Sequence, residues 1–181
     1  LNGSQTAPLL RSFLTPLTVS ADSATKVYDG NATAALNNVT PYDDSKVGGA
    51  LAWSGKDVGS HGLTGLYTTS QQGYIISYDN AVNLTITPKT LTAGLTGTVE
   101  KVYDGTTAAT LTNANFSLAG LFAGDVVNVS GAARYDNKNV NVGKNVTVTG
   151  MNLSGADAGN YSVNSDAAGN VGVITARPLT A

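Results

Sequence analysis

Residues that could carry acid–base or nucleophilic chemistry are few in this sequence. It contains twelve Asp and Glu side chains, one histidine and no cysteine. The histidine, His61, stands between Gly59 and Gly62 in a loop-like segment, so neither a histidine-based triad nor a multi-histidine metal site can form within the chain. No two carboxylates occupy an apolar segment that would separate their pKa values. We therefore expect no enzyme activity, no catalytic or cofactor-binding residues, no bound metal and no cofactor.

A tyrosine beside a carboxylate, a pairing common in sugar binding, occurs twice, as Tyr28-Asp29-Gly30 and Tyr103-Asp104-Gly105. Asp-Gly is also a turn signal, because glycine adopts positive φ without steric cost. A neighbouring tyrosine can pack its ring while its hydroxyl stays hydrogen-bonded or wet. We interpret both segments as a structural motif that makes a turn, in preference to a recognition site.

Three other aromatic side chains suggest an alternative function, carbohydrate binding. Trp53, Tyr67 and Tyr74 could stack against sugar rings, which would make the chain a carbohydrate-binding module with exposed aromatic residues. Trp53 has no counterpart in the repeat described below, and this weakens a role shared by both copies.

Acceptor patterns of the form Asn-x-Ser/Thr suggest possible glycosylation. Strands that alternate outward Asn or Thr with inward Val produce the same pattern for structural reasons. The pattern occurs at Asn2, Asn31, Asn38, Asn83, Asn115, Asn128, Asn145, Asn152 and Asn160.

The sequence contains an internal repeat, so the structural elements that hold the candidate residues are expected to occur twice. The segment Lys26-Val27-Tyr28-Asp29-Gly30 returns letter for letter as Lys101-Val102-Tyr103-Asp104-Gly105, and further matches follow in the same order, among them Tyr74 with Tyr161. We predict a linker or terminal strand over residues 1–16, a first module at 17–90 and a second at 91–178. Residues 179–181 would begin a next module.

Apolar residues alternate with Thr or Asn in segments such as Asn145-Val146-Thr147-Val148-Thr149, which is typical of half-buried strands. Frequent turn residues separate these segments, so we expect an all-β fold of two tandem, elongated, small β-sandwich-like modules. The stretches 43–53 and 117–123 could instead be short helices, and the alternative is a pair of β-grasp-like modules with one short helix each.

Charge and hydropathy exclude two classes of partner. The net charge is −2, and the ten Lys and Arg residues are spread thinly, so nothing could neutralise a line of phosphates. No apolar run is long enough to span a bilayer. We expect no nucleic acid partner and no membrane insertion.

The repeated segment resembles the YDG repeat of filamentous-haemagglutinin-like and high-molecular-weight bacterial adhesins, which are exported by two-partner secretion. Residues 91–178 carry the resemblance most fully, through Ala123-Gly124-Asp125, Asn141-Val142-Gly143-Lys144 and the stretch from Gly155 to Tyr161. Residues 17–90 keep the Tyr-Asp-Gly start and the closing Ile-Thr-Pro but lack the middle segments, so the first copy is divergent. The resemblance implies secretion, display at the bacterial cell surface, and a role as stalk, spacer or adhesive module. Its expected partners are neighbouring repeats of the same protein and a glycan or protein receptor on a host surface.

Overall fold

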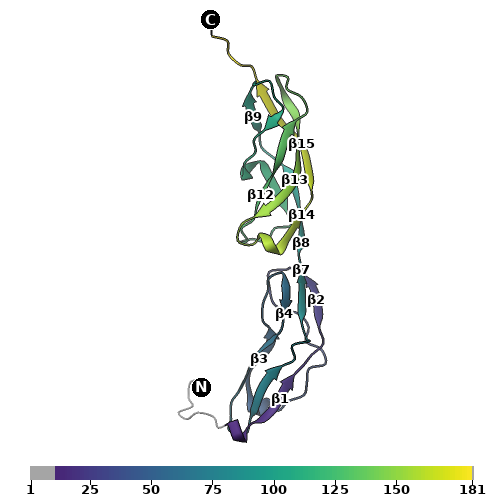
Figure 1. The fold of residues 1–181 in the computed structure, drawn as a ribbon, viewed down its shortest axis with the longest axis vertical. Coiled ribbons are helices and arrows are strands. Elements are labelled where there is room, and N and C mark those ends of the chain that lie inside the picture. The colour runs from purple at the N-terminus through teal and green to yellow at the C-terminus, as the bar shows by residue number, and fades with distance from the viewer. Residues whose placement is uncertain (1–10, 181) are drawn as a thin grey trace. The chain divides into compact units, whose positions relative to one another are not determined.

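The computed structural model describes residues 11–180 and is mainly β (Figure 1). Strands make up 51% of the structure and helices 7%. Within residues 11–180, every helix is a single turn of three residues, and none is long and apolar enough to cross a membrane. The chain divides into two compact units, residues 1–87 and 88–181, which we call unit 1 and unit 2.

Unit 1 is built from strands of three to seven residues, with one long connection between β2 and β3. Its first strand β1 pairs in parallel with β6, and its second strand β2 pairs in parallel with β7, which also takes β4 as an antiparallel neighbour. Strands β3 and β5 form a separate antiparallel pair. The strands are β1 (Thr15–Val19), β2 (Ala24–Val27), β3 (Val47–Trp53), β4 (Gly59–His61), β5 (Leu63–Thr68), β6 (Tyr74–Tyr78) and β7 (Leu84–Thr87).

Unit 2 contains a five-stranded sheet of order β10-β12-β13-β15-β9 and a three-stranded sheet of order β11-β8-β14. As in unit 1, the first strand pairs in parallel with the strand before last, here β8 with β14. The second pairs in parallel with the last, here β9 with β15. The strands are β8 (Lys89–Leu95), β9 (Val99–Val102), β10 (Ala108–Ala109), β11 (Phe116–Ala119), β12 (Asn128–Tyr135), β13 (Asn141–Ser154), β14 (Tyr161–Val163) and β15 (Asp166–Thr175).

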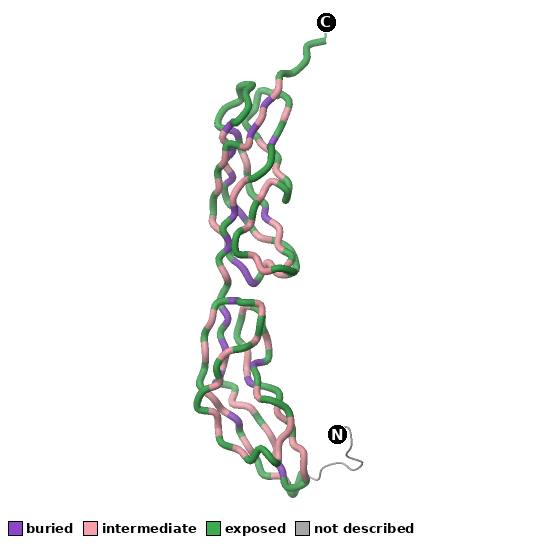
Figure 2. The backbone as a smooth tube through the Cα atoms, turned by 180° about the vertical axis from the view of Figure 1, so that it is seen from behind, coloured by how far each residue is buried: buried purple, intermediate pink, exposed green. Residues whose placement is uncertain are grey.

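The core of unit 2 receives side chains from both of its sheets. Ala93 of β8 packs with Val129 and Val148 of the five-stranded sheet, and a second cluster joins Tyr135 to Ile174. Buried positions alternate with intermediate ones along β13 and β15 and with exposed ones along β8, and Figure 2 draws these classes in purple, pink and green. Full burial of a valine or isoleucine side chain, such as Val148 or Ile174, contributes about 1.5–3 kcal/mol to folding.

The sequence-based prediction of an all-β fold is confirmed, and so is the alternation along β13, where Val146 and Val148 are fully buried. Of the two stretches considered as helices, 43–53 is mostly strand, and 117–123 begins as strand and continues as turn and irregular chain. Residues 47–53 form β3 after one turn of 3-10 helix at Asp44–Lys46, and residues 116–119 form β11. Glycines at 48, 49 and 120 disfavour helix there.

The predicted terminal segments are only partly described. Residues 1–10 and Ala181 lie outside the described residues, whereas Arg11–Phe13 form a 3-10 turn and β1 begins at Thr15. Leu179 and Thr180 belong to no helix or strand.

Candidate functional site

The repeated Tyr-Asp-Gly segment follows directly after a strand of a parallel pair in both units. In unit 1, the Tyr28 N–H donates to the Thr87 carbonyl at 2.9 Å, one residue beyond the end of β2. In unit 2, the Tyr103 N–H donates to the Thr175 carbonyl, also at 2.9 Å. The motif tyrosine therefore makes the last backbone hydrogen bond between the second and the last strand of each unit.

A lysine three residues before the aspartate closes the turn. Lys101 Nζ lies 2.8 Å from Asp104 Oδ1 and donates to the Thr106 carbonyl at 2.9 Å. Lys26 Nζ does the same in unit 1, lying 2.6 Å from Asp29 Oδ1 and 2.6 Å from the Asn31 carbonyl. The aspartate also accepts a backbone N–H two residues further on, from Thr106 in unit 2 and Asn31 in unit 1. We call this arrangement the lysine clasp.

The glycine of the motif turns the chain between the two groups that the lysine holds. Gly30 has φ +80° and Gly105 has φ +81°, a left-handed conformation that residues with a Cβ rarely adopt. A Cβ at either position would meet no atom within 4 Å. Glycine is therefore required there by backbone conformation and not by a close neighbour.

The electrostatics of the clasp follow from these contacts. The hydrogen bond from Lys101 lowers the pKa of Asp104 to about 2, with a further contribution from the Thr106 N–H. The Lys26 ammonium lowers the pKa of Asp29 in the same way. Both carboxylates stay ionised at neutral pH and already accept hydrogen bonds within their own turns, so the arrangement is suited to holding a loop rather than to proton transfer.

The motif tyrosines differ in burial. Tyr28 is 1% exposed, whereas Tyr103 is half-buried and packs against the cluster that contains Tyr135. The Tyr135 hydroxyl donates to the Val99 carbonyl at 2.9 Å, and its ring lies 5.4 Å from Lys101 Nζ. Burial raises the pKa of Tyr135, and the charges of Glu100 and Asp104 add to the effect. The Tyr135 ring thus lies beside the clasp and packs with Val99 and Ile174.

The structure also contains a buried lysine that the sequence did not single out. The Lys144 side chain is 3% exposed, and Nζ lies 2.7 Å from Asp136 Oδ1 and donates to Asn137 Oδ1 at 2.7 Å. The contact with Lys144 lowers the pKa of Asp136. This ion pair fastens the loop between β12 and β13. In the sequence, Lys144 ends the Asn141-Val142-Gly143-Lys144 segment that carries the family resemblance, and it also stands at an inward-facing position of an alternating strand.

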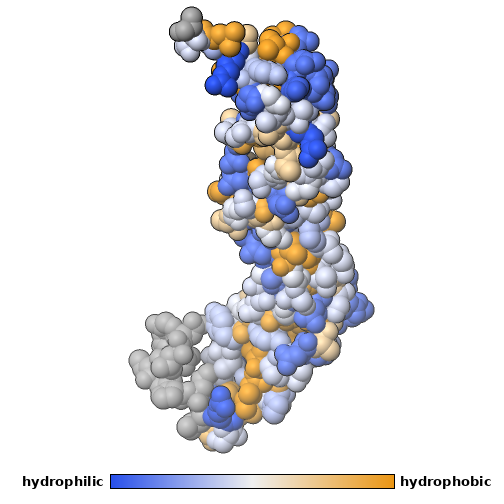
Figure 3. All heavy atoms as spheres, turned by 45° about the horizontal axis from the view of Figure 1, so that its top comes forward, coloured by the Kyte–Doolittle hydropathy of each residue, from blue (hydrophilic) through white to orange (hydrophobic). Residues whose placement is uncertain are grey.

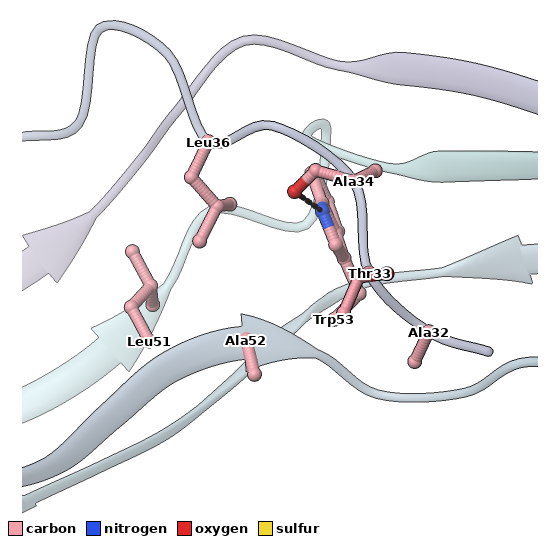
Figure 4. Close-up of a pocket in the computed structure, with 7 residues that line it drawn as sticks. All are labelled: Ala32, Thr33, Ala34, Leu36, Leu51, Ala52 and Trp53. Atoms are coloured by element: carbon pink, nitrogen blue, oxygen red, sulfur yellow. Dashed lines mark hydrogen bonds between the residues drawn. The ribbon is translucent and has the colours of Figure 1, made fainter.

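The prediction of an exposed Trp53 is wrong, because the residue is only 4% exposed. The indole lies beneath the segment 32–36, and Nε1 donates to the Ala34 carbonyl at 3.4 Å (Figure 4). A pocket of about 130 Å³ opens there, lined by Ala32, Thr33, Ala34, Leu36, Leu51, Ala52 and Trp53. None of these seven residues is titratable, so the pocket could hold a small apolar group but could not perform acid–base chemistry.

The two tyrosines grouped with Trp53 are engaged within unit 1. The Tyr67 side chain is 45% exposed and lies against Gly48, where a Cβ would stand 2.4 Å from the ring. Tyr74 is half-buried, and its hydroxyl accepts the Asp43 N–H at 3.2 Å. Tyr161 of unit 2 likewise accepts the Phe122 N–H at 3.2 Å, so the matched tyrosines hold loops in both units. The structure does not gather the three aromatic residues into one exposed platform.

The Asn acceptor positions differ in access. Asn160 is 6% exposed, so a glycan could be attached there only before unit 2 folds, while Asn2 lies outside the described residues. Asn31, Asn38 and Asn152 are exposed, and Asn83, Asn115, Asn128 and Asn145 are half-buried.

His61 and the loop carboxylates do not assemble a site. His61 Nε2 lies 2.6 Å from the Asp57 carbonyl, and Asp157 Oδ2 accepts the Val126 N–H at 2.7 Å. Among residues 11–180, no group of three or more His, Cys, Asp or Glu side chains is placed to hold a metal ion.

Comparison with known proteins gives one family. Residues 87–168 match the family model described as YDG domain, and this range contains the whole clasp of unit 2. Residues 87–168 are therefore a YDG domain within a mainly β chain. No curated protein and no solved structure matched the chain.

Proposed function

We propose that this chain is a non-catalytic tandem-repeat segment of a secreted bacterial surface adhesin, in which it acts as a stalk or spacer. In this proposal the chain holds two copies of one small β-sandwich-like module, the second of which is the YDG domain. Adhesion to host cells or surfaces would be a property of the whole protein. Neighbouring repeats would be the direct partners of each unit.

The observation that carries the proposal is the recurrence of the lysine clasp at the same place in both units. Lys26 and Lys101 each bind an aspartate three residues later and a carbonyl beyond the glycine, and each clasp follows a strand paired with the last strand of its unit. The groups that recur are the ones that close a turn, and this favours a repeated scaffold over a single reactive site.

The visible surface is consistent with a spacer. Small groups of apolar side chains lie among hydrophilic ones on the face drawn in Figure 3. Exposed apolar residues such as Val27 and Val102, at 56% and 53%, stand at matching positions of the two units. Scattered exposed apolar residues are ordinary on soluble domains.

The test uses the full-length protein on the cells that produce it. Antibody raised against this chain should label intact cells without permeabilisation, and labelling only after permeabilisation would refute surface display. A spacer role predicts that deleting residues 17–178 reduces adhesion and that an unrelated β-repeat segment of equal length restores it. If adhesion is unchanged by the deletion, the spacer role is wrong. If the replacement fails to restore adhesion, the residues of this chain bind the receptor themselves.

A further inference from the structure

The two parallel strand pairs of each unit join its entrance to its exit. In unit 2 the chain enters through β8 and leaves through β15. Strand β9, which follows β8, is paired with β15 from Val99 opposite Gly172 to Val102 opposite Thr175. Unit 1 repeats this arrangement with β2 and β7, from Ala24 opposite Leu84 to Val27 opposite Thr87 (Figure 1).

Parallel pairing decides how such a unit carries tension along the chain. Tension pulls the entry strands toward their amino ends and the exit strand toward its carboxyl end. In a parallel pair these opposite pulls act along one axis, so all hydrogen bonds of the pair are loaded together. In an antiparallel hairpin pulled apart at its open end, the bonds break one after another.

Side-chain hydrogen bonds reinforce the β9–β15 pair of unit 2 and the β2–β7 pair of unit 1. Thr175 Oγ1 donates to the Lys101 carbonyl at 3.4 Å, and Thr87 Oγ1 donates to the Lys26 carbonyl at 3.2 Å. With the Tyr103 and Tyr28 amides, these hydrogen bonds complete the last rung of each pair. The lysine clasp then fixes the chain immediately beyond that rung.

Asn164 gives the β8–β14 pair of unit 2 an additional rung. Its Oδ1 accepts the Ala93 N–H at 2.7 Å, and its Nδ2 donates to the Ala93 carbonyl at 3.1 Å. The amide therefore bonds both backbone groups of Ala93, as a paired strand residue would. It does so in the short connection from β14 to β15, through which load from the exit strand reaches β14.

We propose that the two parallel pairs of each unit, β1–β6 with β2–β7 in unit 1 and β8–β14 with β9–β15 in unit 2, are force-bearing clamps that resist unfolding when the chain is pulled between its ends. The Tyr-Asp-Gly turn ends one pair of each clamp. The inference rests on the proposed spacer role only for the purpose of the clamps, which would be to keep a spacer folded under tension. Forced unfolding is governed by the unfolding barrier and not by the overall stability of the unit. A clamp is therefore detected as an unfolding force that depends on the direction of pulling.

The experiment is single-molecule pulling of the full chain through engineered cysteines, which are unique because the sequence has none. Handles at Pro88→Cys and Arg177→Cys load unit 2 from entrance to exit. Handles at Ser130→Cys and Asn152→Cys, which face each other across β12 and β13, open the antiparallel hairpin. We expect the unfolding force to be at least about twofold higher in the first geometry, since its bonds are loaded together.

A variant separates the clamp from general stability. Asn164→Ala should lower the force between handles 88 and 177 and leave the force between handles 130 and 152 unchanged. Asn152→Ala, which removes an amide bonded to Gly150 within its own strand, is the matched control in the first geometry and should change nothing.

Equal forces in the two geometries would overturn the clamp, whether or not Asn164→Ala folds. An equal loss of force in both geometries for Asn164→Ala would assign that residue a merely structural role and remove it from the clamp. The outcome does not depend on cell-surface labelling or adhesion, so the clamp and the proposed function fail separately.

Discussion

Lys101 Nζ lies 2.8 Å from Asp104 Oδ1, and the matching pair Lys26–Asp29 has the same spacing in sequence and a distance of 2.6 Å. In both pairs the lysine side chain is mostly buried, at 17% and 14% exposed, while the aspartate is about half exposed. The lysine stem packs along the strand and its charge reaches the turn. Both copies of the repeat thus keep a turn that is closed by an ion pair between its own lysine and aspartate.

Acid should weaken unit 2 through this pair. The folded-state pKa of Asp104 is about 2, below its ordinary value of 3.8, so its stabilising contribution is complete above about pH 4 and is lost as the pH falls toward 2. Calorimetry should show that Asp104→Asn melts below the parent at pH 7 and that the two curves converge near pH 2. Lys101→Met should reduce the same pH dependence without abolishing it, because Thr106 still donates its N–H and hydroxyl to Asp104. A constant difference between parent and Asp104→Asn at every pH would contradict this assignment.

The motif glycine should tolerate no side chain despite its open surroundings. Gly105→Ala should lower the free energy of unfolding by about 1–2 kcal/mol, because φ +81° strains a residue that has a Cβ. Gly159→Ala is the matched control, since a Cβ there also meets no atom within 4 Å and its φ lies outside the left-handed region. Denaturant unfolding checks both variants, and equal effects would show that backbone conformation is not the reason for glycine at position 105.

The buried lysine should matter more than its exposed neighbour. Lys144→Ala should destabilise unit 2 by about 2 kcal/mol, because it removes a packed aliphatic stem together with the ion pair to Asp136. Lys138→Ala, in the same loop and exposed, should change the free energy of unfolding by less than about 0.5 kcal/mol. Similar losses in the two variants would mean that Lys144 is not buried as described.

Trp53, the one tryptophan of the chain, reports on unit 1 alone. Its 4% exposure predicts weak quenching of its fluorescence by acrylamide in the native state and strong quenching after denaturation. Trp53→Ala should destabilise unit 1 by about 3–5 kcal/mol, because a large buried ring is lost. If acrylamide quenches the native protein almost as strongly as the denatured chain, Trp53 is exposed after all, as a sugar-stacking role requires.

Local patterns predicted much of the fold and less of the site. The alternation around Val146 and Val148 identified a half-buried strand, and Asp-Gly identified the turns, because both signals act between neighbouring residues. The Lys101–Asp104 spacing was visible in the sequence, but its meaning depends on the left-handed glycine that brings the Thr106 carbonyl toward Nζ. A single sequence does not reveal that geometry.

Contacts between distant residues could not be read from the pattern. Asn164 lies 71 residues from Ala93, and nothing near it marks a side chain that replaces a strand residue. Trp53 is covered by the segment around Ala34, which forms no strand, and the irregular pairing between Gly49 and Ala52 changes the register of β3 before the ring. Burial set by irregular segments leaves no periodic signal.

Amide hydrogen exchange at Tyr28 and Tyr103 tests most directly whether the Tyr-Asp-Gly turn ends a parallel strand pair in both units. Each amide donates to a carbonyl of the last strand at 2.9 Å. Both should therefore exchange only when their own unit unfolds. Exchange of either amide as fast as that of exposed loops would contradict this account, because the turn would then not be joined to the strand that leaves the unit.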